Sequence, residues 1–147
     1  MTNHAVLSAS ASHRWLNCPP SVRLTERIPD NGSIYAAEGS EAHELCEFKL
    51  RQLLGMEAHN PLDTPIGLQY YDGTMEDAAT GYAAFVLELL EEIRKTCSDP
   101  IVMVEQKLDY SRWVKDGYGT GDAVIVADGT LHIIDMKFGK GLLVSAE

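Results

Sequence analysis

Residues 120–137 read TGDAVIVADGTLHIIDMK, and this stretch decides the fold. Two apolar runs rich in β-branched residues flank the pair Asp128-Gly129, which is the strongest short-range signal for a β-hairpin. A two-residue turn at this pair places Ala127 opposite Thr130 and fixes the register of the residues farther out. The sequence therefore predicts a central antiparallel hairpin.

This register brings three charged side chains to one end of the hairpin. Asp122 lies opposite Asp135, and Lys137 points to the same face two residues beyond. Carboxylates that face each other destabilise a strand pair by about 0.2–1 kcal/mol on an exposed surface, and by more when buried. A shared proton, the Lys137 ammonium or a divalent cation must compensate. The last two together describe a metal-dependent hydrolytic site.

Structural roles are the alternatives for these residues. Asp122 follows Gly-Thr-Gly and can serve as a turn residue, whereas Asp135 and Lys137 can form an ion pair within the strand. We favour a site, because a buried carboxylate must be paired and the register gives two acids for one lysine. Both faces of the hairpin are largely apolar, so we also expect it to be covered on both sides.

Composition limits the class of protein. The 147 residues are enough for one domain, and they carry a formal net charge of −10. Proteins that hold DNA by its phosphates usually present a basic surface, so this charge argues against a stand-alone nucleic-acid binder. We find no signal peptide or membrane span, and three widely spaced cysteines indicate neither disulfides nor zinc. We expect a cytoplasmic protein with reduced thiols.

The chain is predicted to carry its helices first and its strands last. The expected elements are helical pieces within 8–27, a helix over Ser40–Met56 with Ser40 as its N-cap, an irregular loop over 57–74, a helix over Asp77–Thr96, a strand over 101–108 and the hairpin. This order predicts an α+β fold, a mixed α/β layer. We expect the helical segment 8–56 to pack on the core formed by 75–147, which consists of a helix and a sheet of about three strands. Such a sheet is small, so we expect 1–147 to be a single domain from the N-terminal part of a longer protein.

Further candidates lie outside the hairpin. His43 sits at the edge of an apolar helical stripe with Glu47 four residues on, and it is either a ligand or a histidine at the edge of the core. Glu105 lies in an apolar run, where it either pairs with Lys107 or contributes a third acid to a metal site. Cys18 would need three partners to bind an iron–sulfur cluster. With Trp15 and Leu16, we expect Cys18 to anchor the core, and Cys46 and Cys97 to be core thiols.

Three segments together resemble a known family. Gly119-Thr120-Gly121-Asp122, followed by the hairpin and by Ile134-Asp135-Met136-Lys137, resembles the core motif of the PD-(D/E)XK nuclease superfamily. Residues 38–47, EGSEAHELCE, resemble the G-x-x-x-H-x-x-x-E helix of its RecB-like exonuclease branch. Residues 8–19 resemble the opening segment of that branch, S-x-S followed by W-x-x-C-P. Three motifs in this order are more specific than any one, and they indicate phage- or prophage-associated relatives.

The resemblance implies a truncated restriction-endonuclease-like core that hydrolyses DNA with Mg²⁺ or Mn²⁺. Lys137 would orient the attacking water, and Glu105 matches less firmly than the other residues. The implied metal ligands are His43, Asp122, Asp135 and the carbonyl of Met136, and the implied catalytic residues are Asp122, Asp135, Lys137 and Glu105.

The sequence departs from the family pattern in two features. The family continues into a helix with a Q-x-x-x-Y motif, and this sequence ends at Glu147 before it. Cys18 is not followed by a late trio of cysteines, so we expect no iron–sulfur cluster. The implied partners are DNA, through the full-length protein, and phage recombination proteins. The alternative is a non-catalytic interaction module on the same scaffold, in a phage or DNA-processing assembly.

Overall fold

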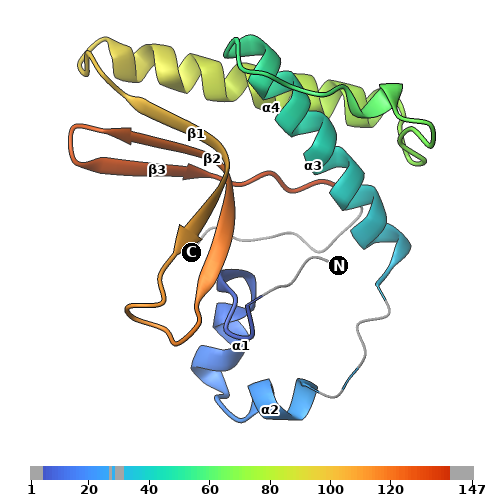
Figure 1. The fold of residues 1–147 in the computed structure, drawn as a ribbon, viewed down its shortest axis with the longest axis vertical. Helices are drawn as coiled ribbons and strands as arrows, with labels where there is room; N and C mark the ends of the chain where they lie inside the picture. The colour runs from blue at the N-terminus through green and yellow to red at the C-terminus, as the bar shows by residue number, and fades with distance from the viewer. Residues whose placement is uncertain (1–4, 27, 29–31, 140–147) are drawn as a thin grey trace. The chain divides into compact units, whose positions relative to one another are not determined.

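The structure is a computed structural model that describes residues 5–26, 28 and 32–139 (Figure 1). In this part of the chain, four α-helices and a three-stranded antiparallel sheet confirm the predicted α+β class. The elements are α1 (Ser12–Asn17), α2 (Ser21–Thr25), α3 (Ile34–Leu53), α4 (Gly73–Arg94), β1 (Ile101–Asp109), β2 (Tyr118–Ala127) and β3 (Thr130–Ile134), with 3-10 turns at Ala9–Ala11 and Pro61–Asp63. Over the same residues, none of the helices has the length and apolarity needed to cross a membrane.

The chain forms two compact units. One comprises the described parts of Met1–Asn31 and Glu105–Gly121, and contains α1, α2 and the loop that joins β1 to β2. The other comprises the described parts of Gly32–Val104 and Asp122–Glu147, and contains α3, α4 and the β2–β3 hairpin. The sheet order is β1-β2-β3, so β2 is the central strand.

Helix α3 begins at Ile34, earlier than the predicted start beside Ser40. Ser33 is the actual N-cap, and its side chain accepts a hydrogen bond from the Ala36 N–H at 3.0 Å. Ser40 lies inside the helix, where its hydroxyl donates to the Ala36 carbonyl at 3.0 Å. The prediction was wrong because both serines are good caps, and because Gly39 costs a helix only about 1 kcal/mol.

Helices α3 and α4 cover one face of the hairpin and form the core with it (Figure 1). The buried residues of this core are Ala42, Leu45, Cys46 and Leu50 from α3, Met75, Ala79, Tyr82, Ala83, Val86 and Leu90 from α4, and Val104, Ala123 and Ile125 from the strands. The thiols of Cys46 and Cys97 are buried, as predicted. Leu16 and Cys18 were predicted as core anchors, and this was wrong, because both are exposed.

The hairpin has the predicted register, from Ala127 opposite Thr130 to Ala123 opposite Ile134. Its turn residues have φ angles of 47° at Asp128 and 76° at Gly129, which a type I′ turn requires. The expectation that both faces are covered was wrong for β3, where Leu131 and Ile133 are each more than half exposed. The reason is that α3 and α4 pack against the opposite face of the sheet.

Candidate metal centre

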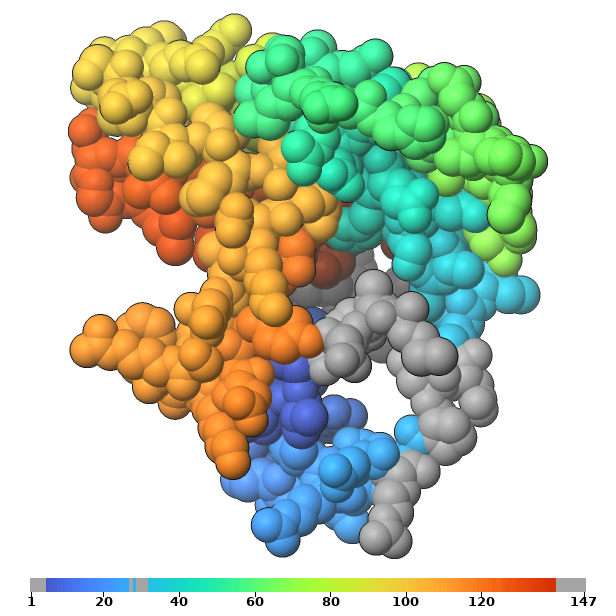
Figure 2. Space-filling view, viewed as in Figure 1, coloured from blue at the N-terminus to red at the C-terminus, as the bar shows by residue number. Residues whose placement is uncertain are grey.

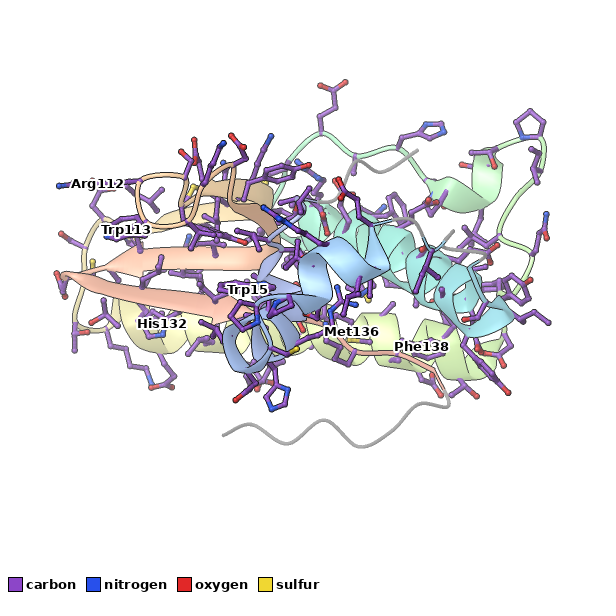
Figure 3. The ribbon with its side chains drawn as sticks, turned by 90° about the horizontal axis from the view of Figure 1, so that it is seen from below. Trp15, Arg112, Trp113, His132, Met136 and Phe138 are labelled. Carbon is purple, nitrogen blue, oxygen red and sulfur yellow. The ribbon has the colours of Figure 1, made fainter. Side chains whose placement is uncertain are left out.

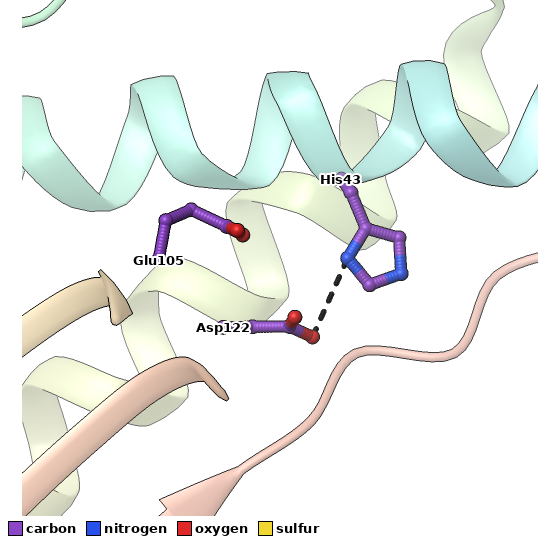
Figure 4. A group of neighbouring side chains, drawn as sticks. All are labelled: His43, Glu105 and Asp122. Carbon is purple, nitrogen blue, oxygen red and sulfur yellow. Dashed lines mark ion pairs between the residues drawn. The ribbon is translucent and has the colours of Figure 1, made fainter. Parts of the chain in front are cut away.

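His43 and Asp122 form the centre of the candidate site. His43 projects from α3 toward the hairpin, and its Nδ1 lies 3.4 Å from Oδ2 of Asp122 in β2 (Figure 4). The Asp122 side chain is 11% exposed and that of His43 33% exposed, so solvent screens this pair only in part. The sequence placed both residues in the site, and the structure brings them together.

The Asp122 carboxylate is held ionised in spite of its burial. Burial alone raises the pKa of a carboxyl group, because it disfavours the charged form. Hydrogen bonds from His43 and from the Met136 backbone N–H, with the positive charges of His43 and Lys137, more than offset this and lower the pKa of Asp122 below its ordinary value. The Met136 N–H bond is 2.6 Å long. An ionised, oriented carboxylate of this kind suits a cation ligand.

Glu105 joins this pair from β1. One ligand atom from each of His43, Glu105 and Asp122 lies within 4.8 Å of the other two (Figure 4). Glu105 has a φ of 52°, in the left-handed region that non-glycine residues rarely adopt inside a strand. Strained backbone of this kind clusters at functional sites. The sequence left Glu105 open between an ion pair with Lys107 and a metal site, and its position in this group favours the latter.

The three side chains fit a divalent cation. Oxygen and nitrogen ligands bind such ions at about 2.0–2.6 Å, so two ligands of one ion lie at most about twice that distance apart. The three ligand atoms lie within 4.8 Å of one another, which is below the upper value of this limit, about 5.2 Å. Two carboxylates with one imidazole suit Mn²⁺ or Mg²⁺, because hard oxygen ligands dominate the set.

Asp135 and Lys137 occupy a different position from the one predicted. The β2–β3 ladder ends at Ala123 and Ile134, and Asp122 instead contacts the backbone of Met136. The Asp135 carboxylate forms a 2.5 Å ion pair with the Lys137 ammonium, and both side chains are about half exposed. Within the described residues, the group of possible ligands does not include Asp135. The roles of Asp135 and Lys137 in binding and catalysis therefore stay predictions.

The sequence did not single out Arg51, which contacts two parts of the site's surroundings. Its Nε donates to Oε1 of Glu47 at 2.7 Å, and its Nη2 donates to the Val104 carbonyl at 3.3 Å. The spacing of four residues between Glu47 and Arg51 is the signal for this pair, since residues so spaced are neighbours on a helix. Glu47 was paired with His43 in the sequence analysis, and its described partner is Arg51.

A protein-family comparison places the whole site within one family. The family model of DUF2800, described as a protein of unknown function, matches residues 4–147. The chain belongs to this family. The match includes all of the candidate ligands, and it names no activity for them. No solved structure matches the chain.

Proposed function

We propose that the chain binds a divalent cation through His43, Glu105 and Asp122, and that this centre is the metal-binding half of a DNA nuclease active site. The observation that carries the proposal is that His43 and Glu105 lie beside the buried carboxylate of Asp122, whose pKa is lowered. The likeness of residues 119–137 to the PD-(D/E)XK motif supplies the reaction class, hydrolysis of a phosphodiester.

The chain's own residues have distinct parts in this proposal. The Met136 N–H orients the Asp122 carboxylate, and His43 would add a nitrogen ligand. Lys137 has an exposed ammonium whose charge already reaches Asp122, so it can attract a phosphate to the centre. When bound, a divalent cation supplies Lewis-acid polarisation of a phosphoryl oxygen and lowers the pKa of a coordinated water.

Calorimetric titration with Mn²⁺ tests the metal centre. We expect wild type to bind one ion per chain, and Asp122→Asn and His43→Ala to lose most of the heat signal while their circular dichroism is unchanged. Asp128→Asn is the matched control, because it removes a carboxylate from the exposed hairpin turn and asparagine tolerates the same backbone conformation. Equal Mn²⁺ affinity in wild type and Asp122→Asn would remove the proposed centre.

Degradation of linear DNA tests the reaction. The full-length protein is incubated with single- and double-stranded DNA in Mg²⁺ or Mn²⁺, beside Asp122→Asn, Asp135→Asn and Lys137→Ala. We expect metal-dependent cleavage by wild type that EDTA abolishes, and a clear loss of activity in Asp122→Asn and Lys137→Ala. A loss in Asp135→Asn as well would show that its carboxylate also takes part in the reaction. If wild type is inert while it binds Mn²⁺, the nuclease assignment is wrong and only the metal site remains.

A non-catalytic module that uses the same scaffold is the second candidate. It is favoured by the position of Asp135 and Lys137, which pair with each other at the surface instead of meeting the Asp122 carboxylate. The net charge of −10 also favours this candidate over a stand-alone DNA-binding enzyme. The two assays separate the candidates, because the module binds Mn²⁺ with no cleavage of either form of DNA.

A further inference from the structure

An exposed tryptophan lies at the tip of the loop that joins β1 to β2. Trp113 is 76% exposed, and the guanidinium of Arg112 lies over its ring, 5.8 Å from the centroid. Figure 3 shows the two side chains together on this loop, which projects outward in the space-filling view (Figure 2). Lys115, two residues on, is also exposed. We call Arg112, Trp113 and Lys115 the Trp113 tip.

The loop that carries the Trp113 tip is held by hydrogen bonds. Tyr110 N–H donates to the Gly117 carbonyl at 3.1 Å, Trp113 N–H donates to the Tyr110 carbonyl at 2.9 Å, and Gly117 N–H donates to the Val114 carbonyl at 2.8 Å. The Tyr110 hydroxyl lies 3.1 Å from the Leu7 carbonyl and fixes the base of the loop. The indole is therefore displayed on an ordered support, so binding through it would lose little conformational entropy.

Charge is distributed unevenly over the chain. The unit that carries the Trp113 tip, Met1–Asn31 with Glu105–Gly121, holds six of the twelve lysines and arginines but only five of the twenty-two acidic residues. Its formal net charge is +1, whereas the other unit has −11. The acidic residues nearest the tip in sequence are Asp109, whose carboxylate accepts the Ser111 N–H at 2.8 Å, and Asp116, which has a φ of 55° within the loop. This unit is therefore close to neutral, although the chain as a whole has a large negative charge.

We propose that the Trp113 tip binds single-stranded nucleic acid, with the indole stacked on an unpaired base and Arg112 and Lys115 beside the flanking phosphates. This inference rests on the proposed nuclease function for its substrate class. Aromatic side chains combined with cations are the general means of binding single strands, because every base offers a flat face and every linkage a negative charge. Duplex DNA buries those faces between stacked pairs, so the tip favours unpaired strands. An acidic protein would form ion pairs with Arg112 and Lys115, but it would not offer a flat ring to stack on the Trp113 indole.

The test measures binding in EDTA, so that neither a bound metal nor cleavage contributes. A fluorescein-labelled oligothymidine is titrated with the full-length protein, and its anisotropy gives the Kd. We expect Trp113→Ala to raise the Kd at least about tenfold and Trp113→Phe to restore most of the affinity. Arg112→Ala and Lys115→Ala should each weaken binding and reduce the salt dependence by about one phosphate contact. Phe85→Ala is the matched control, because Phe85 is an exposed aromatic on α4 in the acidic unit, and it should leave the Kd unchanged.

Tryptophan fluorescence gives a second readout. The chain has two tryptophans, and the indole N–H of Trp15 is bonded to the Ser8 carbonyl at 2.9 Å. Quenching by unlabelled oligothymidine should therefore persist in Trp15→Phe and disappear in Trp113→Phe. The inference is overturned if wild type does not bind the oligonucleotide, if Trp113→Ala binds as wild type does, or if duplex of equal length binds more tightly. Competition by polyglutamate as effective as that by oligothymidine would identify an acidic protein as the partner instead.

These outcomes are independent of the metal centre. If Asp122→Asn binds Mn²⁺ as wild type does while Trp113 still controls binding of the oligonucleotide, the proposed metal centre fails and the Trp113 tip remains. If Mn²⁺ binding depends on Asp122 but the Kd for the oligonucleotide is the same with and without Trp113, the metal centre remains and the proposal for the Trp113 tip fails.

Discussion

Arg51 of α3 donates a hydrogen bond to the carbonyl oxygen of Val104, at 3.3 Å, directly before the strained residue Glu105. Its Nε is bonded to Glu47 at the same time, so the guanidinium is fixed on the helix that also carries His43. The helix thereby holds β1 at the residue where its backbone turns into the left-handed region. Arg51 is therefore a positioning residue for Glu105, and it is not itself a ligand.

We predict that Arg51→Ala raises the Kd for Mn²⁺ about 10-fold or more, which is typical when a group that supports a metal ligand is removed. Arg51→Lys should recover only part of the affinity, because a single ammonium cannot reproduce the two bonds of the planar guanidinium. Calorimetry measures both values. Arg94→Ala is the control, since Arg94 is exposed in the last turn of α4. An Arg51→Ala protein with unchanged affinity would show that Glu105 is placed without this contact.

A second prediction concerns pH and the ion pair that joins α3 to α4. Lys49 Nζ lies 2.6 Å from Oε1 of Glu76, and the Tyr71 hydroxyl donates to the other carboxylate oxygen. The hydrogen bond from Lys49 is the main cause that lowers the pKa of Glu76. A lowered pKa in the folded state means that the stabilisation is present above the unfolded pKa and is lost as pH falls through the folded value.

We therefore expect Glu76→Gln to reduce the free energy of unfolding by about 0.5 kcal/mol at pH 7, a small value because the Glu76 side chain is more than a third exposed. The difference from wild type should shrink as the pH falls below the ordinary pKa of a glutamate, and it should be lost once Glu76 is protonated in the folded state. Urea unfolding over a series of pH values measures it. Glu92→Gln, which breaks the more exposed pair with Lys95 within α4, should have a smaller effect over the same series. A difference that grows on acidification would contradict the sign of the Glu76 pKa shift.

Local signals in the sequence predicted the hairpin, whereas the position of the Asp135 side chain depends on contacts outside the hairpin. The Asp128-Gly129 turn and the alternation of side chains fix the register from Ala127 to Ala123, because each depends only on neighbouring residues. Extending this register by one more pair put Asp122 opposite Asp135, but β3 ends at Ile134. Beyond a strand end the path of the chain is set by tertiary contacts, which periodicity does not encode.

Only those parts of the candidate site that depend on local patterns could be predicted from the sequence. His43 was found because helical spacing places it at the edge of a buried stripe, and Asp122 because the hairpin register places it at the end of the hairpin that carries the charged side chains. The contact of Arg51 with Val104 joins residues 53 positions apart, so no local pattern predicts it. The left-handed φ of Glu105 is equally invisible, since glutamate has no preference for that conformation.

A third prediction tests the hairpin turn. Gly129 has a φ of 76°, and a Cβ added there would meet no atom within 4 Å, so only the backbone opposes a side chain. We expect Gly129→Ala to lower the free energy of unfolding by about 1 kcal/mol. Gly73→Ala is the matched control, because Gly73 is equally open but lies in the first turn of α4, where alanine is favoured. Urea unfolding should show opposite or clearly unequal effects, and equal losses would argue against a type I′ turn.

A fourth prediction tests whether the conformation of the loop contributes to binding, apart from the three side chains of the Trp113 tip. A Cβ at Gly117 would lie 2.4 Å from the Tyr110 ring and 2.7 Å from the Val114 carbonyl oxygen, closer than atoms can approach. Gly117→Ala should therefore displace the loop and raise the Kd for oligothymidine several-fold, although Arg112, Trp113 and Lys115 all remain.

Gly119→Ala is the control for this prediction, because its Cβ would meet Ala9 at 3.6 Å, an ordinary contact. Hydrogen exchange at the Trp113 amide, which is bonded to the Tyr110 carbonyl, should accelerate in Gly117→Ala and not in Gly119→Ala. Faster exchange with an unchanged Kd would mean that the indole binds without the ordered loop. Unchanged exchange would mean that the loop accommodates the methyl group by moving the Tyr110 ring, and the affinity should then match that of wild type.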